Sequence, residues 1–313
     1  MESRPPDTQA PRLRETFKAW WQASRPPFYI ATLIPLVLGY LAAAREHGPP
    51  DPLIFCGALL VCFFLHLTAN LGNDLFDHLQ GTDTHANIGG SRVLQEGKIS
   101  PRRLGQVIAV CYILAFALTG LGVFLTGLRL LWLLTSFGAF SSFFYVAPPI
   151  RYGYRALGEL FVFLNMGLIM VEGVYYALSG AFSAQVLALA VPVGLMVAAI
   201  LYYQSLPEIE SDKAMGKNTL AGRLGPEKAF FLFGLWWPAI WTLMGMLFLC
   251  GLCSWKTLPG IALCLPLHLK ACRKLKQAGG DWFSLDRYGY LTRLMYLICG
   301  LSLILGVYSL KLR

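Results

Sequence analysis

Long apolar stretches recur along the whole chain and constrain its fold more than any other feature. A membrane-spanning helix needs about 20 mostly apolar residues, and we find nine such stretches: 28–44, 53–71, 104–125, 130–146, 157–178, 182–203, 229–250, 255–269 and 288–310. Of the 313 residues, 56% are apolar and 14% are charged, whereas soluble domains have about 45–50% and about 25%. This composition excludes a disordered chain, a coiled coil and an ordinary water-soluble enzyme.

The expected fold class is an all-α polytopic membrane protein with nine transmembrane helices. In hydrocarbon every backbone N–H and C=O must be satisfied internally, and these stretches lack the alternation of a barrel strand. We expect one domain over 1–313, in which 1–19 is a polar N-terminal segment without the apolar core of a signal peptide. The eight cysteines are scattered through apolar stretches, where we expect them to pack as small apolar residues.

The basic residues predict the orientation of the bundle. If the N-terminus is cytoplasmic, the cytoplasmic segments hold 21 of the 26 Lys and Arg residues and the outer segments hold 5. Cytoplasmic loops of membrane proteins carry such an excess, so the net charge of +9 needs no nucleic-acid partner. We expect an integral protein of the cell (inner) membrane with its active-site loops in the cytoplasm. Trp20 and Trp21, just before the first stretch, are typical of an interfacial anchor.

A first polar cluster ends the second apolar stretch. Asn70, Asn73, Asp74 and Asp77 are spaced i, i+3, i+4 and i+7, which places their side chains along one face of a continuing helix. His66 lies one turn earlier. A solvated helix end would explain one such residue but not four. Oxygen ligands of this kind suit Mg²⁺, so we predict a metal site.

A second polar cluster follows the sixth stretch. Glu208 and Asp212 are one helical turn apart, and Lys213 and Lys217 follow closely. Cations beside a simple metal site would repel the metal. The mixture is sensible if a polyanion binds to both, with metal bridging carboxylates to phosphate oxygens and Lys or Arg neutralising the remainder. An ordinary mixed-charge loop is the alternative.

Together the two clusters predict an enzyme acting on a prenyl diphosphate. A prenyl diphosphate would place its charged diphosphate at the membrane surface and its apolar tail in the bilayer. Asp74, Asp77, Glu208 and Asp212 are the predicted catalytic acids, and with Asn70 and Asn73 they form the predicted metal set. The predicted diphosphate contacts are Arg25, Arg92, Arg151, Lys213 and Lys217.

Four further residues are predicted to line the prenyl or acceptor pocket: Tyr145, Glu172, Tyr176 and Tyr203. Glu172 lies inside the fifth apolar stretch. A carboxylate in hydrocarbon is costly and usually faces a cavity or a partner. It would therefore either contact the hydroxyls of an acceptor or be held neutral by a neighbouring tyrosine.

The motifs resemble those of the UbiA superfamily of intramembrane prenyltransferases. Asn70-x-x-Asn73-Asp74-x-x-Asp77 with Asp83 is similar to its first Asp-rich motif, and Glu208-x-x-x-Asp212 with Gly216-Lys217 to its second. The segment Gly89-Gly90-Ser91-Arg92-Val93-Leu94 resembles the MenA branch, the 1,4-dihydroxy-2-naphthoate polyprenyltransferases, as do Arg25-Pro26 and Tyr145-x-x-Pro148-Pro149.

This resemblance implies a helical bundle with a central cavity that opens to the cytoplasmic side. It also implies Mg²⁺ as cofactor and transfer of a polyprenyl group to dihydroxynaphthoate with loss of its carboxylate, giving demethylmenaquinone. The acceptor could instead be 4-hydroxybenzoate, homogentisate or a glycerol phosphate lipid. A transporter is the rival from another class, but it would place ionisable groups nearer the bilayer midplane.

Overall fold

The computed structural model describes residues 13–82 and 90–310, and within these ranges every regular element is a helix. The long helices are α2 (Ile30–His47), α3 (Pro52–Leu79), α4 (Pro101–Thr126), α5 (Leu130–Phe144), α8 (Ala184–Ser205), α11 (Pro226–Leu249), α12 (Leu258–Gln277) and α13 (Tyr290–Tyr308). A further continuous stretch joins α6 (Gly158–Val162), the π-helix η3 (Phe163–Ile169) and α7 (Met170–Ser179). The shorter helices are α1 (Leu13–Ser24), α9 (Ile209–Ala214) and α10 (Leu220–Leu224), and 3₁₀ turns cover Pro26–Phe28, Tyr152–Arg155, Trp255–Thr257 and Trp282–Tyr288.

Side-chain caps start three of the long helices. Asp51 accepts a hydrogen bond from the Leu53 amide, 2.7 Å, and Ser100 and Ser183 accept in the same way at the starts of α4 and α8. Pro follows the cap directly in α3 and α4, where its missing N–H costs nothing. These signals lie between the apolar stretches, so the sequence sets where these three helices begin.

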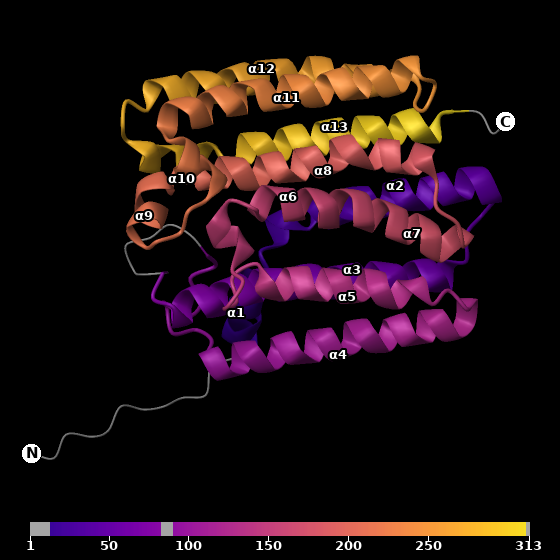
Figure 1. The fold of residues 1–313 in the computed structure, drawn as a ribbon, viewed down its shortest axis with the longest axis horizontal. Coiled ribbons are helices and arrows are strands. Elements are labelled where there is room, and N and C mark those ends of the chain that lie inside the picture. Colours follow the sequence, from indigo (N-terminus) through magenta and orange to yellow (C-terminus); the bar gives the residue numbers. More distant parts are fainter. Residues whose placement is uncertain (1–12, 83–89, 311–313) are drawn as a thin grey trace, which may run out of the picture.

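The long helices lie side by side with their axes roughly along one direction (Figure 1). The short helices α1, α9 and α10 gather at one end of this bundle, and the end of α13 lies at the other (Figure 1). We call the first the motif end; it contains the described parts of the connections after α3, α5 and α8, which are 80–82 with 90–100, 145–157, and 206–219.

Six helical stretches of the described chain are long and apolar enough to cross a membrane, or seven if α1 and α2 count as one bent span. The remaining two, α5 and α12, fall short because α5 has only 15 residues and α12 ends in a basic segment. All nine predicted stretches therefore coincide with helices, but a count of nine spans stays a prediction.

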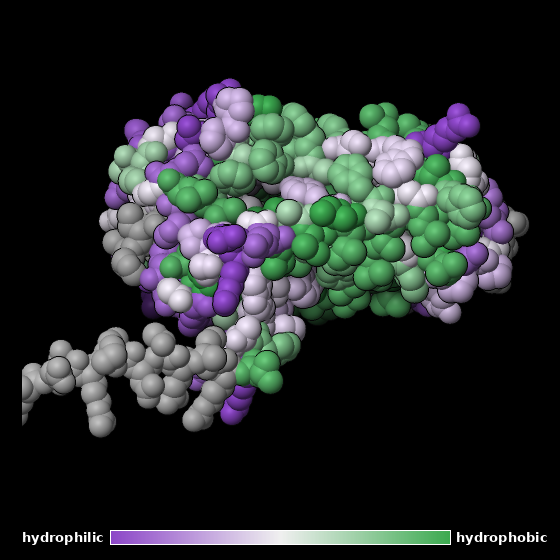
Figure 2. All heavy atoms as spheres, turned by 90° about the horizontal axis from the view of Figure 1, so that it is seen from below, coloured by the Kyte–Doolittle hydropathy of each residue, from purple (hydrophilic) through white to green (hydrophobic). Residues whose placement is uncertain are grey.

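The surface supports a membrane setting. Figure 2 shows a broad hydrophobic face over the middle of the bundle, with hydrophilic residues concentrated toward its two ends. Large apolar side chains such as Ile113 (66% exposed), Phe124 (81%) and Leu263 (61%) point outward, which a soluble protein would avoid over so wide an area. All eight cysteines are free, so Cys250 and Cys253 do not form a disulfide.

Glycine allows a close helix contact between α8 and η3. A Cβ built on Gly194 of α8 would lie 2.6 Å from the Phe163 carbonyl oxygen of η3, closer than side-chain carbons approach backbone atoms. Close approach of small residues is a main source of helix association in lipid. This contact fixes α8, which leads into the second motif, against the stretch that walls the cavity described below.

We predict that Gly194→Ala destabilises the protein, because overpacking of this kind costs about 1–3 kcal/mol. The measurement is the midpoint of thermal unfolding in detergent. Gly245→Ala on α11 is the matched control, since a Cβ there meets nothing within 4 Å. Equal midpoints for the two variants would contradict the proposed contact.

Candidate active site

Asp74 is held in a buried cradle at the motif end. Its carboxylate forms an ion pair with Arg25, which directly follows α1. The backbone N–H of Ser91 donates to the same carboxylate, 3.0 Å, and the Ser91 hydroxyl donates to its second oxygen. Asp74 is only 3% exposed. Burying a carboxylate is costly without such partners, and these three donors compensate for the burial of Asp74.

Asp77, one turn further along α3, is held by a second set of groups. The Tyr154 hydroxyl donates to its carboxylate, 2.7 Å, and the same hydroxyl is hydrogen-bonded to Thr82, 2.7 Å. Asp77 is 2% exposed. Tyr154 lies on the 3₁₀ turn between α5 and α6, where burial, followed by the charge of Asp77, raises the pKa of its hydroxyl. It therefore stays a neutral hydrogen-bond donor.

The second motif places a carboxylate beside a buried cation. The Lys217 ammonium lies 3.3 Å from Asp212, and both side chains are largely buried. Burial raises the pKa of Asp212, although Lys217 opposes that shift. Burial alone would lower the pKa of Lys217. The negative charges of Asp212, Asp77 and Glu208 outweigh this effect, so the pKa of Lys217 is raised. Lys217 is thus a permanent cation among carboxylates.

Tyr154 and Lys217 join the two motifs. The Lys217 ammonium lies 5.7 Å from the centre of the Tyr154 ring. The backbone N–H of Asn218 donates to the backbone carbonyl of Tyr154, 3.0 Å. The charge of Asp77 also contributes to the raised pKa of Asp212, after burial as the main cause. The two motifs are far apart in sequence but meet at one end of the bundle.

Three of the arginines predicted to bind diphosphate share an unusual backbone. Arg25, Arg92 and Arg151 have φ of 51°, 66° and 43°, and Ala156 is the fourth such non-glycine residue in the described chain. Left-handed backbone costs free energy in such residues and concentrates at functional sites. All three arginines lie at the motif end, as does Lys213, whose side chain is exposed.

Their side chains differ in what they contact. Arg25 binds Asp74, whereas Arg151 donates to the Gln80 side chain and lies 5.7 Å from the Tyr154 ring centre. Arg92 lies 4.0 Å from Glu96 on the exposed side of the loop. Arg25 therefore contacts a motif carboxylate directly, Arg151 lies beside Tyr154, and Arg92 lies at the edge of the site.

The residues at the motif end fit a divalent cation that is held partly by the protein and partly by a bound substrate. Among the described residues, no three His, Cys, Asp or Glu side chains are grouped so as to hold a metal unaided. However, two buried oxygens lack hydrogen-bond partners, Asn73 Oδ1 and Asp212 Oδ2. Such oxygens are costly to leave unpaired, and Mg²⁺ takes carboxylate or amide oxygens together with water and substrate phosphates.

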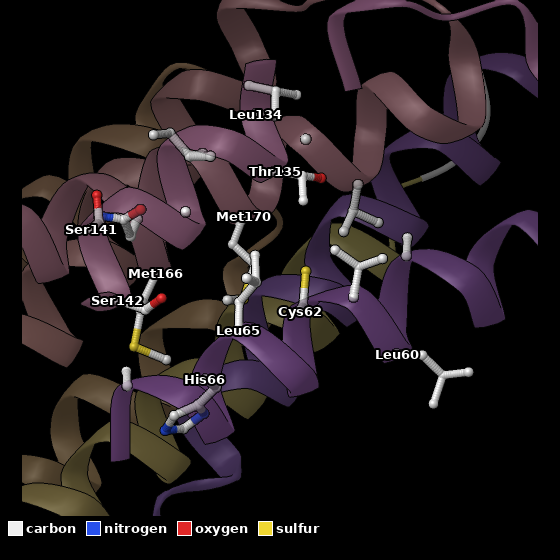
Figure 3. Close-up of a pocket in the computed structure, with 18 of the residues that line it drawn as sticks. Leu60, Cys62, Leu65, His66, Leu134, Thr135, Ser141, Ser142, Met166 and Met170 are labelled. Carbon is white, nitrogen blue, oxygen red and sulfur yellow. The ribbon is translucent and has the colours of Figure 1, made fainter. Parts of the chain in front are cut away.

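A cavity of about 420 Å³ extends from this site into the bundle. Asn70, Asn73, Arg25, Tyr145 and Gln204 line it at the motif end. The rest is largely apolar and is formed by α3, α4, α5, η3, α7 and α8. Figure 3 shows part of this wall, to which α3 contributes Leu65, η3 contributes Met166 and α7 contributes Met170.

The cavity follows α3 for most of its length. Residues from Leu53 to Asn73 of that helix contribute to the lining, which corresponds to about 30 Å at 1.5 Å per residue. That length matches the hydrocarbon thickness of a bilayer. Some lining residues, such as Leu60 and Leu121, are also exposed on the outer surface, by 42% and 49%. The cavity is therefore open to the surroundings of the bundle.

His66 and Thr32 add a polar pair to the cavity wall. The Nδ1 of His66 on α3 lies 2.5 Å from the Thr32 hydroxyl on α2, and His66 lines the cavity one turn before Asn70 (Figure 3). The stripe of polar residues predicted on α3 therefore begins inside the apolar part of the bundle.

The four residues predicted to line the pocket lie in different environments in the structure. Tyr145 lines the cavity. Tyr203 is buried against Phe233 and donates to a backbone carbonyl, 3.1 Å, and Tyr176 stacks on Phe182. Glu172 is buried near the opposite end of the bundle. The latter three are not among the described residues that line the cavity.

Sequence reasoning missed the groups that hold the carboxylates. Tyr154, Thr82 and the backbone and side chain of Ser91 bond to the acids or to one another, yet no role was predicted for them. The one available signal was the position of Ser91 next to Arg92 in a glycine-containing loop. Asp83 and Gly89, which belong to the predicted motifs, lie outside the described residues.

Known proteins resemble this chain in sequence and fold. The model of the UbiA prenyltransferase family matches residues 32–281. The 1,4-dihydroxy-2-naphthoate octaprenyltransferase of Haemophilus influenzae is 31% identical over 226 residues, 69% of this chain and 72% of that protein. The 2-carboxy-1,4-naphthoquinone phytyltransferase of Synechocystis is 29% identical over 271 residues, 84% of each chain.

Among solved structures, a UbiA homolog from Archaeoglobus fulgidus bound to DMAPP and Mg²⁺ has a TM-score of 0.60 at 16% identity. The alignment covers 93% of this chain and 100% of that one, and it shows that the two share a fold. The family match covers well over half of the sequence and includes both acidic motifs. This chain therefore belongs to the UbiA prenyltransferase family and is a prenyltransferase.

Proposed function

We propose that this enzyme transfers a polyprenyl group from a prenyl diphosphate to a dihydroxynaphthoate-like acceptor, with loss of the carboxylate, as in menaquinone biosynthesis. The observation that carries the proposal is the contact between the motifs through Tyr154 and Lys217 at the mouth of a long apolar cavity. A charged head and an apolar tail on one substrate match these two environments.

The carboxylates and cations would hold the diphosphate between them. Asn70, Asn73, Asp74 and Asp77 on one side and Glu208 and Asp212 on the other would hold Mg²⁺ together with the diphosphate. Bound there, Mg²⁺ would neutralise the charge that develops on the leaving diphosphate. Arg25, Arg92, Arg151, Lys213 and Lys217 would contribute fixed positive charge at the same end.

The cavity would receive the prenyl chain and protect the reacting carbon. As the C–O bond of the prenyl diphosphate breaks, the electron pair leaves with diphosphate and an allylic cation remains. Apolar walls exclude water that would capture this cation. The face of an aromatic ring such as Phe161, which lines the cavity, would stabilise it.

The acceptor ring would enter near Tyr145 and Gln204. Attack by a ring carbon forms the new C–C bond, and loss of CO₂ or of a proton restores the aromatic ring. Relatives that are named for a naphthoate or a carboxynaphthoquinone support a naphthoate-like acceptor. The alternatives are 4-hydroxybenzoate, homogentisate and a glycerol phosphate lipid.

The orientation is part of the proposal. The loops that hold most Lys and Arg residues belong to the motif end (Figure 1). By the positive-inside rule this supports the proposal that the motif end faces the cytoplasm, in a cell (inner) membrane. This location would give the site direct access to a soluble acceptor and to a lipid-borne donor. The grouping of the acids at one end also favours an enzyme over a transporter.

The direct test is an assay of purified protein in lipid with one labelled prenyl diphosphate and a panel of aromatic acceptors. We expect dihydroxynaphthoate to give the highest kcat/KM, one CO₂ per product, and loss of turnover when EDTA removes divalent ions. Preference for another acceptor would retain the prenyltransferase but overturn the naphthoate assignment.

Asp74→Asn is expected to lower kcat by at least about 100-fold, the scale of losing an electrostatic group that acts on the leaving group. The asparagine keeps the shape but removes the charge that pairs with Arg25. Glu210→Gln on α9 is the matched control, because Glu210 is an exposed acid at the same end and should keep wild-type kcat. Near wild-type turnover by Asp74→Asn would refute the role assigned to Asp74.

Glu172→Gln is expected to leave the KM of both substrates within about twofold, since Glu172 does not line the cavity. The measurement is steady-state kinetics beside Tyr145→Leu, which does alter the lining and should raise the acceptor KM. An increase of about tenfold or more in the acceptor KM of Glu172→Gln alone would return Glu172 to the substrate pocket.

A further inference from the structure

Helix α1 carries an uncovered apolar row that faces away from the protein. Leu13, Phe17 and Trp21, spaced i, i+4 and i+8, are 90%, 68% and 56% exposed. The rings of Phe17 and Trp21 stack on each other with centroids 6.2 Å apart. Since residues four apart share one face of a helix, these side chains form a continuous stripe that nothing in the described chain covers.

The opposite side of α1 is firmly attached to the protein. Ala19 and Ala23 are 5% and 0% exposed and belong to a small core with Val93, Leu94 and other residues of α3, α4 and the loop 90–99. Helix α1 is bent by 55° from α2, so it does not continue the axis of that helix. It lies as a separate helix at the motif end (Figure 1).

Two basic residues border the apolar stripe. Arg14 and Lys18 follow Leu13 and Phe17 by one position, so they form a parallel row about 100° around the helix, and both are exposed. Apolar and basic rows side by side are typical of helices that lie in the interface of a bilayer, with the apolar row among acyl chains and the basic row at the headgroups. This charge complementarity points to anionic phospholipid.

Hydrogen bonds connect the same helix to the active site. Gln22 donates to the Ser91 carbonyl, 2.7 Å, and to Glu96, 3.1 Å, and accepts from Lys98, 2.7 Å. Ser91 in turn donates through its backbone and side chain to Asp74. The residue that follows α1, Arg25, forms an ion pair with Asp74. Helix α1 therefore contacts Asp74 by two separate routes.

We propose that α1 docks on anionic phospholipid of the surrounding bilayer and thereby positions the loop 90–99 and Arg25 around Asp74. The effect on turnover rests on the proposed function, whereas the docking and the ordering of the loop do not. Gln22 is a positioning residue in this arrangement. The enzyme would then be fully ordered only when the motif end lies against a negatively charged membrane surface.

The test uses the full-length protein in nanodiscs of phosphatidylcholine alone or with about a third phosphatidylglycerol. Hydrogen exchange is measured by mass spectrometry for peptides that cover 13–24 and 90–99. We expect both segments to exchange at least about fivefold more slowly in the anionic discs, since each basic residue near such a surface contributes about 1 kcal/mol. High salt should remove the difference.

Variants separate docking from coupling. Arg14→Gln with Lys18→Gln should abolish the lipid dependence of both segments. Arg102→Gln with Arg103→Gln removes two exposed charges at the same end, at the start of α4, and should retain it. Gln22→Ala should leave α1 protected by anionic lipid while the loop 90–99 loses its protection. In the prenyl transfer assay, wild-type kcat should be about fivefold higher in anionic discs.

Exchange rates of 13–24 that are equal in the two lipids would overturn the docking. A lipid effect on 13–24 without one on 90–99 in the wild type would overturn the coupling. Protection of α1 that depends on two chains per disc rather than on lipid charge would assign the stripe to a second copy and also overturn the proposal. If no disc supports prenyl transfer, the proposed function fails, and the exchange data still decide the role of α1.

Discussion

The structure depends on burying several carboxylates at the edge of a bundle that is otherwise apolar. Asp74, Asp77 and Asp212 are each less than about a tenth exposed, and isolated buried carboxylates would be strongly disfavoured. Arg25 and Lys217 pair with two of them, and the Tyr154 hydroxyl bonds to the third. These partners come from α1, the turn before α6 and the segment after α9, so the charge pairing also determines how the motif end is assembled.

The same pairing prepares the site for exchange of partners. A buried ion pair contributes little net stability but is costly to break on one side only. A diphosphate and its metal would supply new partners to both sides at once: anionic oxygens for Lys217 and Arg25, and a cation for the carboxylates. The unpaired oxygens of Asn73 and Asp212 indicate that the protein alone does not complete the hydrogen bonding of this site.

Most of the fold and of the acid set could be predicted because they obey periodic rules. Apolar runs reveal each long helix, and the spacing of Asn70, Asn73, Asp74 and Asp77 reveals a helix face. Contacts between distant segments obey no such rule. Nothing in the local sequence says that Tyr154 meets Asp77 or that Ser91 bonds to Asp74, because those contacts depend on how the loops fold. For Glu172, the sequence showed that the residue lies inside an apolar stretch. It did not show that the side chain lies away from the cavity lining.

The division of the cavity explains how one fold can serve different acceptors. The motif end is fixed by charge pairs that involve both motifs, whereas the wall along α3, α4 and α7 is mostly apolar and open to the outside of the bundle. Apolar walls discriminate weakly between similar molecules, at about 1–3 kcal/mol per methylene, whereas buried polar groups discriminate strongly. Under the proposed function, acceptor choice should therefore lie with the few polar groups that line the cavity, among them Tyr145, Gln204 and His66, and not with its apolar wall.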